Sequence, residues 1–129
     1  MRNTLRTVSL TLQSLLYAAA GVNHFVHTRT YTAIMPPHWS HPVGWVLFTG
    51  AAEVAGAVGL LIPQTRRSAA WGIIAMLVVY FDVHIYMLVH ADLFHTVPLW
   101  ALWLRIPLQF VLIAWAWIYT RPHYTRRVR

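Results

Sequence analysis

Ionisable and amide side chains interrupt several long apolar stretches of this sequence. Two carboxylates, Glu53 and Asp82, stand inside such stretches, and a carboxylate can accept or release a proton during a reaction. Side chains that can hydrogen-bond a ligand stand at similar positions, namely His24, His84, Arg105 and Gln109. These residue types predict catalytic proton transfer at Glu53 or Asp82 and ligand binding by the other four.

The spacing of these residues indicates which of them can face a common point. Arg105 and Gln109 are four residues apart, so they share one face of a helix. Asp82 and His84 are two residues apart and diverge by about 200° on a regular helix, so they cannot both aim at one point. One face of the first apolar stretch carries a polar and aromatic stripe formed by Gln13, Tyr17, Ala20, His24 and His27.

The composition excludes several other kinds of site. Because the chain has no cysteine, it contains no disulfide, thiol nucleophile or cysteine-ligated metal. Glu53, Asp82 and His84 are suitable ligand types for a metal ion, but the Glu-x-x-His spacing of di-iron bundles is missing. We therefore predict a ligand-binding site without a metal.

Four apolar stretches must position these residues, and they cover residues 5–25, 43–62, 68–89 and 98–119. Each has about the 20 residues that an α-helix needs to cross a membrane. The chain is 58% hydrophobic and 10% charged, whereas soluble domains average about 45–50% apolar and about 25% charged residues. We therefore predict an all-α protein with a single domain, a bundle of four transmembrane helices in a lipid bilayer.

The distribution of arginine predicts the orientation of this bundle. The net charge is +7, and most arginines stand before the first stretch, in the turn at residues 66–67 or after the last stretch. Loops rich in arginine stay in the cytoplasm, so we expect both termini there and the connections 28–42 and 90–97 outside. The arginines form no extended basic patch, and we expect no binding of nucleic acid.

A cleaved signal peptide is an alternative interpretation of the first apolar stretch. Arg2 and Arg6 precede an apolar run that leads to three alanines at residues 18–20. Gln13 interrupts that run, and cleavage would leave three helices with mismatched ends. We therefore favour a first transmembrane helix.

In this topology, charged residues from three helices fall in one layer. At 1.5 Å of rise per residue, Glu53 lies roughly 15 Å below the outer boundary, and Asp82 and Arg105 lie roughly 10–12 Å below it. Ionisable residues inside a membrane are expected to face the interior and to pair. Arg105 can pair with one carboxylate, as a purely structural lock between helices or as part of a site. The second carboxylate then needs a proton, a histidine or a ligand.

Several short motifs follow one another in a characteristic order, namely Gly21–Phe25, Met35–Pro37, Thr49–Glu53, Gly59–Pro63, Arg105–Gln109 and Ala114–Trp117. Together they span about residues 15–117 and resemble the DoxX-like family of small four-helix membrane proteins. The resemblance implies a four-helix fold, a bacterial inner membrane and polar residues at His24, Glu53, Arg105 and Gln109.

The same resemblance suggests a function. Some DoxX-like proteins resemble or belong to quinone-linked enzymes, including thiosulfate:quinone oxidoreductase subunits, and others act in the maturation of partner proteins. We predict a small quinone-interacting redox protein or accessory subunit, with electrons supplied by a membrane redox partner or a bound cofactor. Without cysteine, a sulfur relay through a protein thiol is disfavoured. The alternatives are a non-enzymatic assembly factor for a membrane partner and a small transporter, which would need to form a homo-oligomer.

Overall fold

The chain folds into helices alone over residues 2–121, the part that the computed structural model describes. In chain order the elements are α1 (Arg2–Val26), α2 (Thr28–Ala33), α3 (Pro42–Leu61), α4 (Arg66–Val89), the 3-10 helix η1 (Ala91–Leu93) and α5 (Leu99–Ile118). The prediction of an all-α fold is confirmed. The four long helices cover the four apolar stretches, and α2 and η1 form short helical turns in the connections, where the sequence predicts loops.

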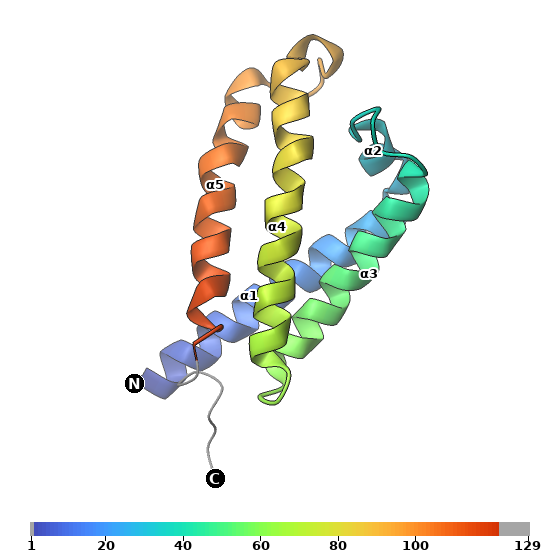
Figure 1. Cartoon of the computed structure of the whole chain (residues 1–129). Helices are drawn as coiled ribbons and strands as arrows, with labels where there is room; N and C mark the ends of the chain where they lie inside the picture. Colours follow the sequence, from blue (N-terminus) through green and yellow to red (C-terminus); the bar gives the residue numbers. More distant parts are fainter. Residues whose placement is uncertain (1, 122–129) are drawn as a thin grey trace.

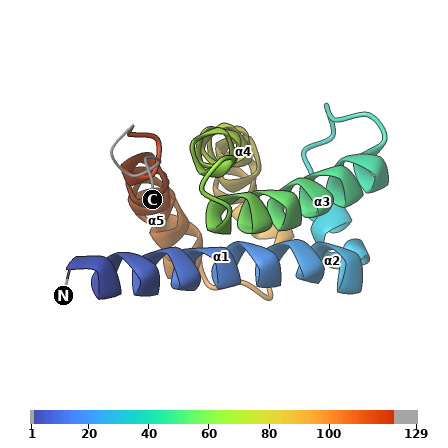
Figure 2. The same ribbon diagram turned by 90° about the horizontal axis from the view of Figure 1, so that it is seen from below.

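The long helices form two antiparallel pairs that cross each other. Helix α1 packs along α3, and α4 packs along α5 (Figure 1). Figure 2 looks nearly along the axes of α4 and α5, whereas α1 and α3 lie across the view. The start of α1 and the turn between α3 and α4 lie at one end of the molecule, the lower end in Figure 1, and α2 and η1 lie at the upper end.

Three of the helices, α3, α4 and α5, are long and apolar enough to cross a membrane. Large apolar side chains such as Phe48, Val78 and Phe110 are exposed on their outer surfaces. Soluble monomers rarely expose large contiguous apolar patches, so this surface is suited to contact with a lipid bilayer. Helix α1 is not among the three, because its 25 residues include arginines and many hydroxyl and amide side chains.

Glycines bring the backbones of α1 and α3 into close contact. A Cβ atom placed on Gly21 would lie 2.6 Å from the carbonyl oxygen of Gly50, and one placed on Gly50 would lie 2.7 Å from the Cβ of His24. No side chain fits at either position without moving a helix. Small residues permit this kind of close packing between helices in membranes, and the contact presses His24 against α3.

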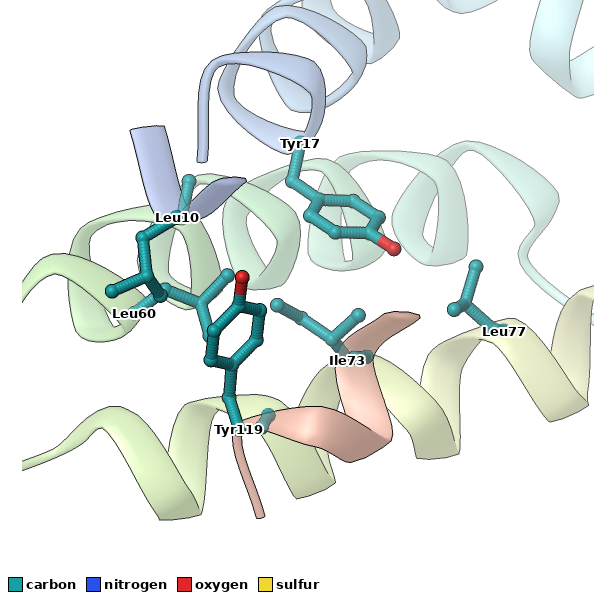
Figure 3. Close-up of a cluster of buried hydrophobic side chains, with 9 residues drawn as sticks. Leu10, Tyr17, Leu60, Ile73, Leu77 and Tyr119 are labelled. Carbon is teal, nitrogen blue, oxygen red and sulfur yellow. The ribbon is translucent and has the colours of Figure 1, made fainter. Parts of the chain in front are cut away.

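The apolar core lies in the lower half of the molecule, where all four long helices contribute side chains. Figure 3 shows six of them, Leu10, Tyr17, Leu60, Ile73, Leu77 and Tyr119, converging on one volume. The hydroxyl groups of Tyr119 and Ser9 form a hydrogen bond, and Trp115 Nε1 donates to the same Ser9 oxygen at 2.9 Å. These bonds tie the end of α5 to α1.

The turn between α3 and α4 is held by a side chain that donates hydrogen bonds to backbone carbonyls at the end of α3. Arg66 Nε donates to the carbonyl oxygen of Leu60 at 2.7 Å, and Arg66 Nη2 donates to that of Leu61 at 3.3 Å. The last carbonyls of a helix have no partner within the helix, so the arginine supplies one. The turn therefore keeps α3 and α4 together at the lower end.

Replacing Gly50 with alanine is expected to lower the free energy of unfolding by about 1–3 kcal/mol, because overpacking forces the helices apart. SDS-induced unfolding of the purified chain in detergent micelles measures this change. Gly72→Ala is the control, since nothing lies within 4 Å of a Cβ there, and alanine favours a helix by about 1 kcal/mol. Equal losses of stability in the two variants would contradict the tight contact between α1 and α3.

Candidate functional site

A cavity of about 400 Å³ lies in the upper half of the molecule, between α3, α4 and the segment that contains α2. Most of its wall is aromatic or aliphatic and includes Met35, Trp39, Trp45, Phe48, Val79 and Val83. Five polar or hydrogen-bonding side chains also line it, namely His24, Tyr31, Thr49, Tyr80 and His84. Small-molecule sites typically combine apolar walls with a few well-placed polar groups.

His24 is buried at the end of α1, and its ring is held by α3. Its Nδ1 atom lies 3.0 Å from the carbonyl oxygen of Val46 and 3.2 Å from Thr49 Oγ1. A carbonyl oxygen can only accept, so Nδ1 carries a proton and donates it to Val46. In the neutral ring, Nε2 is then unprotonated, and it faces Glu53.

Glu53 lies on the buried face of α3, and its Oε2 atom is 3.6 Å from His24 Nε2. This distance is within ion-pair range but too long for a hydrogen bond. Within residues 2–121, Oε2 therefore has no hydrogen-bond partner. The hydroxyl group of Tyr80, on α4, interacts electrostatically with the Glu53 carboxyl. Glu53 and His24 can therefore share a proton in a buried setting, in which His24 lines the cavity and Glu53 lies behind it.

The second predicted catalytic carboxylate lies elsewhere. Asp82 is partly exposed on α4, and its Oδ2 atom lies 2.6 Å from His38 Nε2 and accepts a hydrogen bond from Trp39 Nε1, also at 2.6 Å. Both partners belong to the segment between α2 and α3. Asp82 therefore fastens this segment over the cavity and does not meet Glu53.

The remaining predicted ligand residues form a separate group on α4 and α5. Arg105 Nη1 donates to Met87 Sδ at 3.1 Å, and Gln109 Nε2 donates to the carbonyl oxygen of Leu77 at 2.6 Å. Within residues 2–121, the expected ion pair of Arg105 with a carboxylate is not found. His84 lines the cavity and interacts with both Arg105 and Gln109, so of these three residues it is the one that reaches the candidate site.

Sequence reasoning missed three residues of the site, Tyr31, Thr49 and Tyr80. The ring of Tyr31 lies 4.1 Å from that of His24, centroid to centroid, because α2 folds back over the end of α1. That placement has no periodic signal in the sequence. Tyr80, in contrast, is four residues before His84 and shares its helix face, so the pattern could have included it.

A family model, described as a domain of unknown function (DUF8561), matches residues 13–120. This range contains every residue of the candidate site, from His24 on α1 to His84 on α4. No curated protein and no solved structure matches the chain.

The geometry predicts which polar residues are energetically coupled. In a double-mutant cycle, Glu53→Gln and His24→Phe are expected to show a coupling energy of about 0.5–3 kcal/mol, as residues in contact do. Glu53→Gln and Arg105→Met share no partner, so their effects are expected to add to within about 0.5 kcal/mol. SDS-induced unfolding supplies all the free energies, and the reverse pattern would contradict the observed pairing.

The role of Asp82 can be tested by substituting asparagine, which keeps the shape of the side chain and removes its charge. A hydrogen bond to a charged group is worth about 1.5–3 kcal/mol, so the Trp39 indole N–H is expected to exchange with solvent about tenfold faster or more. Nuclear magnetic resonance of the ¹⁵N-labelled indole groups measures this exchange. Asp92→Asn, in the exposed η1 turn, is the control and is expected to leave the rate unchanged.

Proposed function

We propose that this chain, which belongs to the DUF8561 family, is a small membrane protein that binds a quinone in the upper cavity. One observation carries the proposal, namely a cavity with apolar and aromatic walls that is lined by His24, whose ring pairs with the buried Glu53 behind it. A quinone head group is a flat, mostly apolar ring whose polar atoms are carbonyl oxygens. The aromatic wall suits the ring, and the hydroxyl and imidazole groups suit the oxygens.

The polar side chains supply what quinone chemistry requires from a protein. A quinone that takes up two electrons also takes up two protons, and it becomes a hydroquinone. Tyr80 is the candidate to donate a hydrogen bond to one carbonyl oxygen, and Glu53, which pairs with His24, is the candidate proton donor or acceptor behind it. His84 is the candidate partner of the second oxygen. Arg105 and Gln109 position His84 in this proposal, and Asp82 holds the segment over the cavity.

The electrons come from elsewhere in this proposal. The chain has no cysteine, so its own side chains include no thiol pair for electron transfer. A membrane redox partner or a bound cofactor therefore supplies the electrons, and the protein supplies binding, orientation and protons. The chain acts as a quinone-interacting redox protein or as the accessory subunit of one. Membership of the DoxX-like family, which suggests the same activity, stays a prediction.

The proposed setting is a bacterial inner membrane that all four long helices cross. Helix α1 has 25 residues and is about 37 Å long at 1.5 Å per residue, enough for a crossing. Its exposed residues include Leu12, Leu15 and Val22, whereas Gln13 and His24 are buried, as expected for a helix with lipid on one side. Arg6, Arg66, Arg67 and Arg121 stand at the lower end, so we propose that this end and the start of α1 face the cytoplasm. The C-terminus predicted to lie on the same side belongs to residues 122–129, outside the described residues.

The binding proposal predicts that the chain in lipid nanodiscs retains a short-chain ubiquinone or menaquinone analogue at about one molecule per chain. Native mass spectrometry counts the bound molecules. Ala75 lines the cavity, and Ala75→Phe is expected to weaken binding about tenfold or more, because the ring occupies part of the volume that the quinone needs. Ala114→Phe adds the same ring at an exposed position on α5 outside the cavity and is expected to have no effect.

Failure of this experiment has a definite meaning. If wild-type chain retains neither quinone analogue, or if both alanine variants lose binding equally, the proposal is wrong. An empty wild-type cavity would favour an assembly factor for a membrane partner, with Glu53 and His24 as structural residues. Proton or solute flux through liposomes containing the chain would instead favour a transporter.

A further inference from the structure

Buried polar side chains continue from Glu53 through the apolar core toward the lower end. Gln13, on α1, is fully buried, and within residues 2–121 neither its amide nitrogen nor its amide oxygen makes a hydrogen bond. Tyr17 follows one turn later on the same face, and its buried hydroxyl group also lacks a hydrogen-bond partner in the part of the chain that the structure describes. Figure 3 shows this hydroxyl group pointing into the core, toward the volume that Ile73 and Leu77 border. The buried polar line therefore passes through the apolar cluster.

Tyr17 connects this line to the candidate site. Its hydroxyl group lies near the Gln13 amide, outside good hydrogen-bond geometry, and interacts electrostatically with the Glu53 carboxyl. The ionisable groups that face Glu53 are thus Tyr17 and His24 from α1 and Tyr80 from α4. The polar groups therefore stand in the order Gln13, Tyr17 and Glu53.

The line also reaches the lower end of the molecule. Ser9 is one turn before Gln13, about 6 Å along the axis of α1, and it is only partly buried. Its hydroxyl group bonds to Tyr119 and accepts a hydrogen bond from Trp115 at 2.9 Å. Polar groups therefore occur at one-turn intervals along α1, from Ser9 at the margin of the core to Tyr17.

Unpartnered polar atoms at these positions need an explanation. Leaving a buried donor or acceptor without a hydrogen bond costs about 1–3 kcal/mol, and Gln13 and Tyr17 together have three such atoms. The other buried glutamine, Gln109, donates to the carbonyl oxygen of Leu77 at 2.6 Å. Buried water molecules typically satisfy such groups and make about three hydrogen bonds each. Water is therefore the natural partner of Gln13 and Tyr17.

We infer that Gln13 and Tyr17 hold a file of water molecules along which protons pass between Glu53 and the lower end of the bundle. At each step, a water molecule or the Tyr17 hydroxyl group accepts a proton from one neighbour and donates its own proton to the next. Gln13 orders the water and carries no proton itself. The net change is one proton taken from solution and one O–H bond formed at the Glu53 carboxylate, or the reverse, with no electron transferred.

This inference deepens the proposed function by assigning the source of the proton that Glu53 gives to a quinone. It rests on the proposed function only for that use of the proton, because exchange at Glu53 can be measured without a quinone. In the proposed membrane orientation, the proton comes from the cytoplasmic side while the quinone enters from the opposite half. Gln13 and Tyr17 would then make quinone reduction sensitive to the membrane potential.

The first test compares two buried glutamines within the unmodified chain. In solid-state nuclear magnetic resonance of the chain in lipid, magnetisation is transferred from water to side-chain amides. The Gln13 amide is expected to receive it early, and the Gln109 amide, which is bonded to protein, is expected to receive it late. A Gln13 amide as slow as that of Gln109 would show that no water lies beside Gln13 and would overturn the inference.

The second test follows the proton on Glu53. Infrared spectroscopy records the carboxyl band after transfer into D₂O at a pH that protonates Glu53, and Glu53→Gln identifies the band among only three acidic residues. Gln13→Leu and Tyr17→Phe are expected to slow its hydrogen–deuterium exchange about tenfold, as loss of one hydrogen bond of about 1.4 kcal/mol would. Leu10→Ala opens space on the same face of α1 without removing a polar group and is expected to leave the rate unchanged.

The outcomes separate this inference from the proposed function. Slowed exchange in a chain that binds no quinone would support the water file and overturn the quinone proposal. Unchanged exchange in Gln13→Leu and Tyr17→Phe would overturn the water file, whether or not a quinone binds. Equal slowing in Leu10→Ala would also overturn it, since the effect would then come from packing.

Discussion

The arrangement of this molecule depends on a carboxyl group buried among apolar helices. Glu53 needs a partner for its charge or its proton, because an isolated buried charge is expensive. The partner is His24, 3.6 Å away on the neighbouring helix. That approach requires α1 and α3 to touch through Gly21 and Gly50, where no side chain fits. The glycine contact and the acid–histidine pair are thus two parts of one constraint.

The cavity follows from how the two helix pairs cross. Helix α3 packs against α4 near the lower turn, where Gly56 and Gly59 face Ile73 and Ala69. Toward the upper end, side chains of these helices and the segment around α2 surround the cavity and do not fill it. The candidate site therefore lies next to the buried apolar core, and Met76 and Tyr80 border both.

The two carboxylates within the apolar helices, Glu53 and Asp82, have different surroundings. Asp82 is partly exposed and bonds to His38 and Trp39, so it organises the segment above the cavity. Glu53 is buried beside His24 and interacts electrostatically with Tyr17. Arg105, which carries the charge best suited to either carboxylate, bonds to Met87 instead. Local surroundings, and not residue type, distinguish a group that holds a segment from one that can exchange a proton.

The sequence by itself determined the helices and the burial of Glu53, Gln109 and His24, because long apolar stretches of 20 or so residues permit little else and polar groups within them avoid lipid. Only the tertiary structure decided the partners. Charge alone favoured Arg105 as the partner of a carboxylate such as Glu53. Because the helix pairs cross, Arg105 instead contacts Met87, and Glu53 pairs with His24. Tyr31 reaches the candidate site and His38 reaches Asp82, because both belong to the segment that connects α1 and α3. The sequence of that segment has no periodicity that predicts its path. Which side chains meet depends on crossing angles and chain path, and these are set by packing across the whole molecule.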